Sequence, residues 1–122
     1  MILAIEELHH VALQVADVAE SVTFYEKVLG FVQLPRPAFI FPGAWFKLGG
    51  QQELHLIGGR EVPVVSSNHG NHFALRVQDI TATATYLKDQ SVTLLGPKQR
   101  ADGAWQIFIQ DPDGHTIEFC QV

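Results

Sequence analysis

The sequence predicts an α+β fold in which two paired βαβββ modules form a curved, cupped mixed sheet around a central cavity. The first observation is a repeat, since residues 10–17 read His-Val-Ala-Leu-Gln-Val-Ala-Asp and residues 72–79 read His-Phe-Ala-Leu-Arg-Val-Gln-Asp. The second is that Gly43-Ala44-Trp45 recurs as Gly103-Ala104-Trp105, each before two predicted strands. Neither half could easily bury its own sheet face, so the two modules are expected to share one cavity.

The first module is expected over about residues 7–58. Val11, Leu13 and Val15 alternate with smaller or polar residues, which is strand periodicity. Asp17 is a predicted helix N-cap, and apolar residues at helical spacing predict a helix over 18–29 that Gly30 ends. Further strands are predicted over 31–34, 45–48 and 53–57. A linker rich in Gly, Pro, Ser and Asn covers residues 59–69.

The second module, residues 70–122, repeats this order. A strand is predicted over 73–77, followed by a helix that Asp79 caps and that runs to about Gln90 with Ile80, Ala84 and Leu87 on its buried stripe. A short strand over 92–95 is expected to end at Gly96 and Pro97. Strands over 105–109 and 116–120 flank the turn Asp111-Pro112-Asp113-Gly114.

Composition narrows the classes of function. The 122 residues fit one domain, and 47% hydrophobic residues allow a packed core. The net charge of −5 and the scattered Lys and Arg residues argue against a nucleic-acid partner. No apolar run approaches the roughly 20 residues of a membrane span. The single cysteine suits a reducing compartment, and Glu6 and Glu7 are unlike a signal peptide, so a cytoplasmic protein is expected.

Four residues are candidate metal ligands. His10 and His72 open the two repeats, and aligning the apolar flanks of the later strands pairs His55 with Glu118. Imidazoles with a carboxylate suit a divalent Zn, Ni, Co, Mn or Fe ion. Glu53 lies one pleat from His55 on the same strand face, so it could replace His55 as the fourth ligand or serve as a base.

Large side chains could line a substrate site. Phe39, Trp45 and Trp105 could belong either to the core or to a substrate wall, with the core favoured for the Trp pair. The remaining histidines, His9, His69 and His115, are expected to be solvated.

The chain resembles the vicinal oxygen chelate superfamily, which includes glyoxalase I, bleomycin-resistance proteins and extradiol dioxygenases. The resemblance depends on residues 10–17, Phe24-Tyr25, residues 28–31, residues 72–77, and Asp111-Pro112-Asp113-Gly114 followed by Ile117-Glu118. It implies paired βαβββ modules, often in a homodimer. It also implies metal ligands at His10, His72 and Glu118, with a fourth from the strand that holds Glu53 and His55. Gln14 stands where bacterial glyoxalase I usually has Arg, which argues against glutathione as the substrate.

The resemblance implies a glyoxalase-like lyase or isomerase that chelates adjacent oxygens of a small substrate at the metal. Glu53 and Glu118 are the candidate catalytic carboxylates, and Gln14, Phe39, Trp45 and Trp105 the candidate substrate contacts. One alternative is an extradiol-type dioxygenase with His10, His72 and Glu118 as a facial triad. Another is a metal-free drug-binding module, although such relatives lack the ligand set that this chain keeps.

Overall fold

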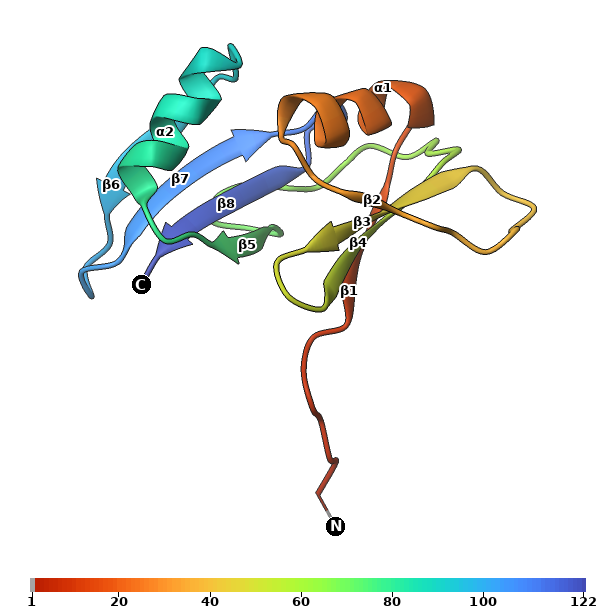
Figure 1. The fold of residues 1–122 in the computed structure, drawn as a ribbon, viewed down its shortest axis with the longest axis horizontal. Coiled ribbons are helices and arrows are strands. Elements are labelled where there is room, and N and C mark those ends of the chain that lie inside the picture. Colours follow the sequence, from red (N-terminus) through yellow and green to blue (C-terminus); the bar gives the residue numbers. More distant parts are fainter. Residues whose placement is uncertain (1) are drawn as a thin grey trace.

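The computed structural model describes residues 2–122 and contains two four-stranded sheets (Figure 1). The first module comprises β1 (His10–Gln14), α1 (Val18–Val22), the π-helix η1 (Thr23–Val28), β2 (Gln33–Leu34), β3 (Gly43–Leu48) and β4 (Gln52–Ile57). The second comprises β5 (Phe73–Arg76), α2 (Ile80–Asp89), β6 (Leu95–Gln99), β7 (Trp105–Gln110) and β8 (Thr116–Gln121). The predicted α+β class with two βαβββ modules is confirmed.

Both sheets have the same strand order, β1-β4-β3-β2 and β5-β8-β7-β6. The first strand of each module runs parallel to the fourth, and the other pairs are antiparallel. The sheets do not join in the single chain: across residues 2–122 no strand pairing links them, so β1 and β5 are both edges. Each of these two edges therefore has main-chain groups available to another strand.

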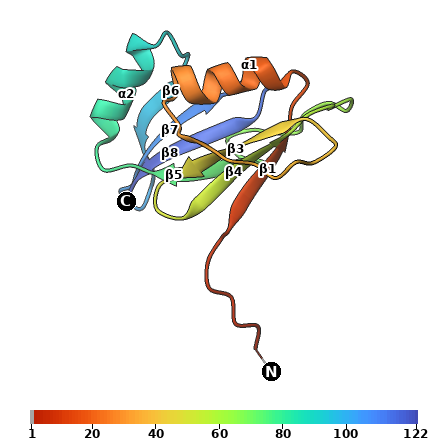
Figure 2. The ribbon, with the colours of Figure 1, turned by 45° about the vertical axis from the view of Figure 1, so that its right-hand side comes forward.

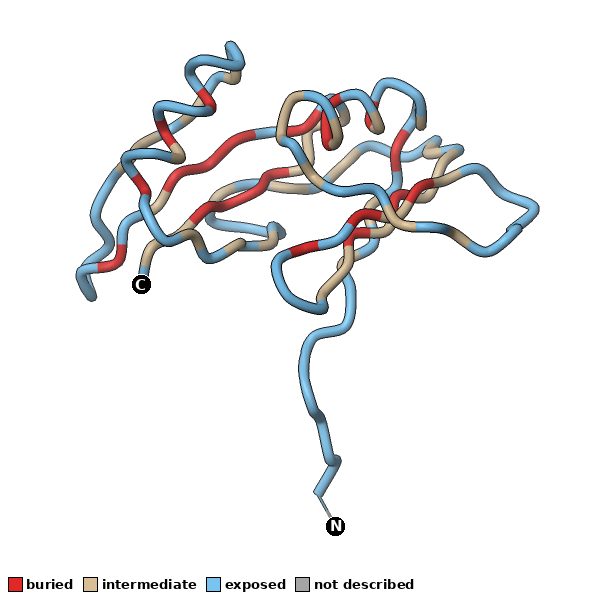
Figure 3. The backbone as a smooth tube through the Cα atoms, in the orientation of Figure 1, coloured by how far each residue is buried: buried red, intermediate tan, exposed pale blue. Residues whose placement is uncertain are grey.

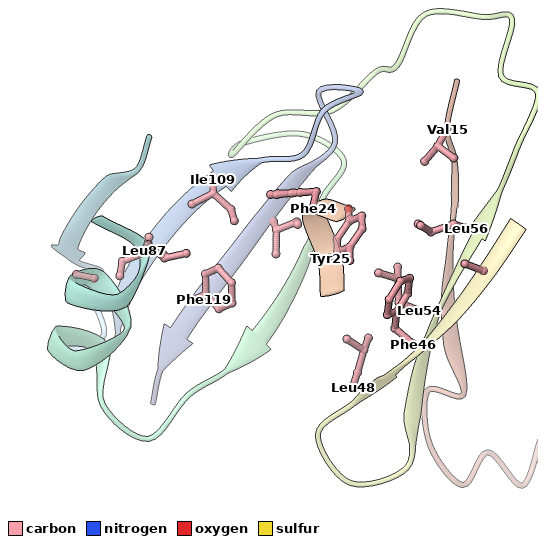
Figure 4. Packing of buried hydrophobic residues seen from close by; sticks show 14 of the residues in the cluster. Val15, Phe24, Tyr25, Phe46, Leu48, Leu54, Leu56, Leu87, Ile109 and Phe119 are labelled. Atoms are coloured by element: carbon pink, nitrogen blue, oxygen red, sulfur yellow. The ribbon is translucent and has the colours of Figure 1, made fainter. Parts of the chain in front are cut away.

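One hydrophobic core serves both modules. The helices lie on the same side of the two sheets (Figures 1 and 2), and the buried residues concentrate where helices and strands meet (Figure 3). Leu54 and Leu56 of β4 and Ile109 of β7 point into this core, together with Tyr25 between the sheets (Figure 4). Ile107 of β7 belongs to the same cluster. Because strand side chains alternate, residues such as His10 and His55 lie on the opposite face.

The helix predicted over 18–29 changes type after Val22. Residues 23–28 form a π-helix, in which the Leu29 amide donates to the Phe24 carbonyl at 2.9 Å. The wider turn brings two consecutive aromatic residues, Phe24 and Tyr25, into the core, which a 3.6-residue period does not favour. Asp17 caps the helix as predicted, accepting from the Glu20 amide at 3.1 Å.

Other boundaries also differ. The strand expected over 92–95 is instead β6, which begins at Leu95 and continues through Gly96 and Pro97 with an irregular register. Proline is tolerated there because β6 is an edge strand. The helix α2 has the predicted Asp79 cap and the predicted buried stripe.

No helix of residues 2–122 is long and apolar enough to cross a membrane.

A polar contact fixes the two modules to each other. Asp113, in the turn before β8, accepts from the Ala16 amide at 2.8 Å and from Arg60 Nε at 2.9 Å. Its neighbour Asp111 accepts a 2.7 Å hydrogen bond from the Tyr25 hydroxyl, and His115 Nε2 lies 2.7 Å from the Gln14 carbonyl. The turn of the second module therefore binds the chain at the end of β1.

Candidate functional site

The strand registers show that the two modules carry equivalent polar pairs. In the first sheet Ala12 of β1 pairs with His55 of β4, and His10 lies one pleat before Ala12. In the second sheet Ala74 of β5 pairs with Glu118 of β8, and His72 lies two residues before Ala74. His10 with His55 and His72 with Glu118 are thus the same positions in two copies of one module. The register agrees with the pairing of His55 and Glu118 predicted from sequence.

The pair in the second module has a fixed orientation. His72 Nδ1 lies 3.2 Å from the Ser67 carbonyl and 3.1 Å from the Gly70 carbonyl, so this nitrogen carries the proton that they accept. His72 Nε2 lies 3.0 Å from Glu118 Oε1. A lone pair on Nε2 and a carboxylate at that distance need a proton or a cation between them. This donor set therefore fits a metal ion.

The carboxylate of that pair is held from its other side. Glu118 is 4% exposed, and Gln106 Nε2 donates to its Oε2 at 3.2 Å. A buried carboxylate needs such partners to remain charged. The amide of Gln106 leaves Oε1 directed at the imidazole of His72.

The first module brings three imidazoles together. The rings of His10 and His55 stack with centroids 4.1 Å apart, and His9 Nδ1 lies 2.9 Å from His10 Nδ1. Desolvation, with smaller contributions from His55 and His9, lowers the pKa of His10. A lowered pKa favours the neutral imidazole, which is the form that binds metals.

Glu53 contacts His55 directly. Its Oε1 lies 2.9 Å from His55 Nε2, and in the register Glu53 pairs with His10. A carboxylate bonded to one ring nitrogen fixes the tautomer and leaves the other nitrogen as a lone-pair donor. Of the two residues left open as fourth ligand, His55 is the one equivalent to Glu118.

The four predicted ligands lie as two pairs in the single chain. Among residues 2–122, no three His, Cys, Asp or Glu side chains are arranged to hold a metal ion. The sequence predicts that all four ligands meet but leaves open whether they do so within one chain or between two chains, and residues 2–122 of one chain do not bring them together. The pairs lie on sheet faces that point away from the shared core.

Two of the four predicted substrate contacts lie in a row next to the first pair. The indole of Trp45 stacks on His55 with centroids 4.0 Å apart and planes 5° apart, and Phe39 lies 6.1 Å from Trp45. Gln14 is exposed on the His10 face of β1.

The core side favoured for both Trp residues holds for Trp105 but not for Trp45, which lies on the outer face beside His55. Trp105 is therefore separated from the other candidate substrate contacts. It alternates with Ile107 and Ile109 and so lies on the core side of β7, in a hollow with Gln78, Asp79 and Gln121. Although Gly-Ala-Trp occurs in both modules, the strand registers do not place Trp45 and Trp105 at equivalent positions.

Phe108 is the residue that sequence reasoning missed. It pairs with Glu118 just as Trp45 pairs with His55, and its ring lies 5.7 Å from that of His72. The spacing in the sequence could have identified Phe108, because Trp45 precedes His55 by ten residues and Phe108 precedes Glu118 by ten.

The repeated sheets and the equivalent polar pairs define a paired-module protein with one polar pair on each module. The model of the Glyoxalase/Bleomycin resistance protein/Dioxygenase superfamily matches residues 7–119. The chain belongs to this superfamily.

Relatives with names that specify an activity are distant. The chain is 29% identical to "Glyoxylase I 4" of Arabidopsis thaliana, covering 97% of this chain and 72% of that protein. It is 30% identical to a probable lactoylglutathione lyase of Synechocystis, covering 93% and 94%. A putative glyoxalase family protein from Bacillus anthracis has a similar crystal structure, with a TM-score of 0.87, 26% identity, and 99% and 98% coverage.

Proposed function

We propose that this protein is a metal-dependent lyase or isomerase of the glyoxalase type, which acts on a small substrate with adjacent oxygens. The observation that carries the proposal is the equal register of His10 with His55 and of His72 with Glu118. A duplicated module that keeps donors at both equivalent places supplies four ligands for one divalent ion. Similarity to proteins named glyoxylase and lactoylglutathione lyase supports a lyase or isomerase reaction.

We propose further that the four ligands meet between two copies of the chain in a homodimer. His10 and His55 of one protomer would face His72 and Glu118 of its partner, since residues 2–122 of a single chain bring no three such donors together. The edges of β1 and β5 could pair across the dimer axis and close the cup. Residues 2–9 extend away from the fold (Figure 1) and expose Ile2, Leu3, Ile5 and Leu8, which a second copy would cover.

In this dimer, the residues around the four ligands have specific roles. Glu53 holds the His55 ring, and Gln106 holds the carboxylate of Glu118. When bound, the metal would stabilise negative charge on the adjacent substrate oxygens. Glu53 would take up the substrate proton, a role that its pairing with His10 in the sheet and its partial exposure support.

Mixing two inactive variants tests the site and the dimer together. His10→Ala and His72→Ala should each lose metal uptake from a nickel or zinc solution, measured by elemental analysis after gel filtration. Unfolding and refolding the two variants together should restore about a quarter of wild-type uptake, since half of random dimers are mixed and each has one intact site. Trp105→Phe, which changes a ring on the other sheet face, should keep full uptake.

Two results would contradict the proposal. Full metal stoichiometry in His72→Ala would remove the residue from the ligand set. Loss of uptake in both variants without recovery in the mixture would show that the ligands do not come from two chains.

A further inference from the structure

A row of neighbouring aromatic rings crosses the outer face of the first sheet and ends at the paired histidines. Phe41 stacks on Phe39 at 5.0 Å, and Phe39 lies 6.1 Å from Trp45. Trp45 then stacks on His55 at 4.0 Å, and His55 stacks on His10 at 4.1 Å. Phe39, Ile40 and Phe41 are exposed, so the loop between β2 and β3 presents apolar side chains next to the candidate metal ligands.

A cation lies over one end of this row. The Arg36 guanidinium carbon is 4.9 Å from the Phe39 ring centroid and 5.0 Å from that of Phe41. Its Nη2 donates to the Phe41 carbonyl at 2.8 Å. Across residues 2–122 no carboxylate forms a salt bridge with Arg36, and its buried Nε has no acceptor.

Gly43 makes room for this arrangement. A Cβ at residue 43 would lie 3.0 Å from Arg36 Nη2, so the absence of a side chain lets the guanidinium rest against β3. Gly43 alternates with Trp45 on the strand, which puts the cation one pleat from the indole, on the same sheet face. A guanidinium that forms no salt bridge within residues 2–122 matches a planar carboxylate.

We propose that this surface binds a planar aromatic carboxylate. The ring of the ligand lies against Phe39 and Trp45, and its carboxylate pairs with the positive charge of the Arg36 guanidinium. Flat rings gain from stacking on flat rings, and a guanidinium over aromatic faces keeps its charge available to an anion. That the ligand's adjacent oxygens reach His10 and His55 rests on the proposed function; the binding of the planar anion does not.

Calorimetric titration of metal-free, full-length protein tests the class of ligand. Naphthalene-2-carboxylate is the planar anion, 2-naphthalenemethanol the planar neutral compound and cyclohexanecarboxylate the non-planar anion. The first should bind about tenfold more tightly than the other two, which corresponds to one charge-assisted contact. Arg36→Gln should remove the preference for the anion, while Phe39→Leu should weaken both naphthalene compounds.

Trp105→Phe is the control and should leave all three affinities unchanged, because that ring is on the core side of β7. Equal binding of cyclohexanecarboxylate, unchanged affinity in both Arg36→Gln and Phe39→Leu, or no binding of naphthalene-2-carboxylate would overturn the inference. Metal uptake is measured separately on the same samples. Anion binding without metal uptake rejects only the proposed function, and metal uptake without the ring and charge dependence rejects only this inference.

Discussion

The hydroxyl of Tyr25 donates a 2.7 Å hydrogen bond to Asp111 Oδ2, and this bond joins the π-helix of one module to the last turn of the other. Tyr25 is fully buried and Asp111 is 6% exposed. Asp111 also accepts from the amides of Asp113 and His115, so the carboxylate shapes its own turn while it binds the first module.

Replacing Tyr25 with Phe should lower the free energy of unfolding by about 1–3 kcal/mol, because a buried carboxylate oxygen loses its donor while the aromatic packing remains. Urea unfolding followed by far-UV circular dichroism measures the change. Tyr86→Phe is a useful comparison, since its hydroxyl donates to the Val28 carbonyl at an exposed position and should matter less. An unchanged midpoint in Tyr25→Phe would contradict the stabilising role of the bond.

Stability should fall in alkaline solution. Burial, and secondarily the charge of Asp111, raises the pKa of Tyr25 far above its usual value near 10. A group whose pKa is higher in the folded state contributes stability that is complete below pH 10 and is lost as the pH rises above it. Urea midpoints between pH 8 and 11 should decrease in the wild type and decrease less in Tyr25→Phe. Parallel curves for the two proteins would reject this explanation.

Asp113→Asn should destabilise the protein by about 3 kcal/mol, since it leaves the partly buried Arg60 without its anion. Asp113 is 5% exposed in its side chain, and its Oδ1 lies 2.9 Å from Arg60 Nη2. Asp102→Asn is the matched control, because its pair with Arg100 at 2.7 Å is exposed to solvent. Thermal unfolding should separate the two variants clearly, and equal melting temperatures would show that the contact between modules is not stabilising.

Gly43→Ala should destabilise the first sheet and displace Arg36. The added methyl group would collide with the Leu56 backbone carbonyl, which cannot move without disturbing the β3–β4 pairing. We expect a loss of about 1–3 kcal/mol, which is typical of overpacking. Gly50→Ala adds the same methyl group where nothing lies within 4 Å and should be nearly neutral. Denaturant unfolding of both variants gives the comparison, and equal stability would contradict the crowding at residue 43.

Local patterns were enough to find most of the architecture. Alternating apolar residues gave strands near β1, β4 and β5, and Asp17 and Asp79 cap helices where their sequence context predicts it. These features depend on neighbours within a few residues, so the sequence carries them directly. The helix after Val22 did not follow its pattern, because the need to bury both Phe24 and Tyr25 outweighed regular α-helical geometry.

Part of the candidate site could also be predicted from the sequence, and part of it required the structure. The repeat that begins at His10 and His72 and the match of His55 with Glu118 follow from the sequence, because a duplicated module keeps its strand positions. The repeated Gly-Ala-Trp motif pointed to Trp105, whereas the strand register places Phe108 beside Glu118. Register depends on the length and irregularity of the turn between two strands, which residue spacing records but a short matching motif does not.

The sequence by itself determined the two modules, the order of helix and strands along each and the donors that each carries. Only the tertiary structure decided that one chain presents the donors as two separate pairs, with the modules fixed by Asp111 and Asp113 and the first strand of each sheet left at an edge. The reason is physical: patterns of polarity select a face for each side chain, but long-range packing and buried hydrogen bonds set how two such faces are oriented.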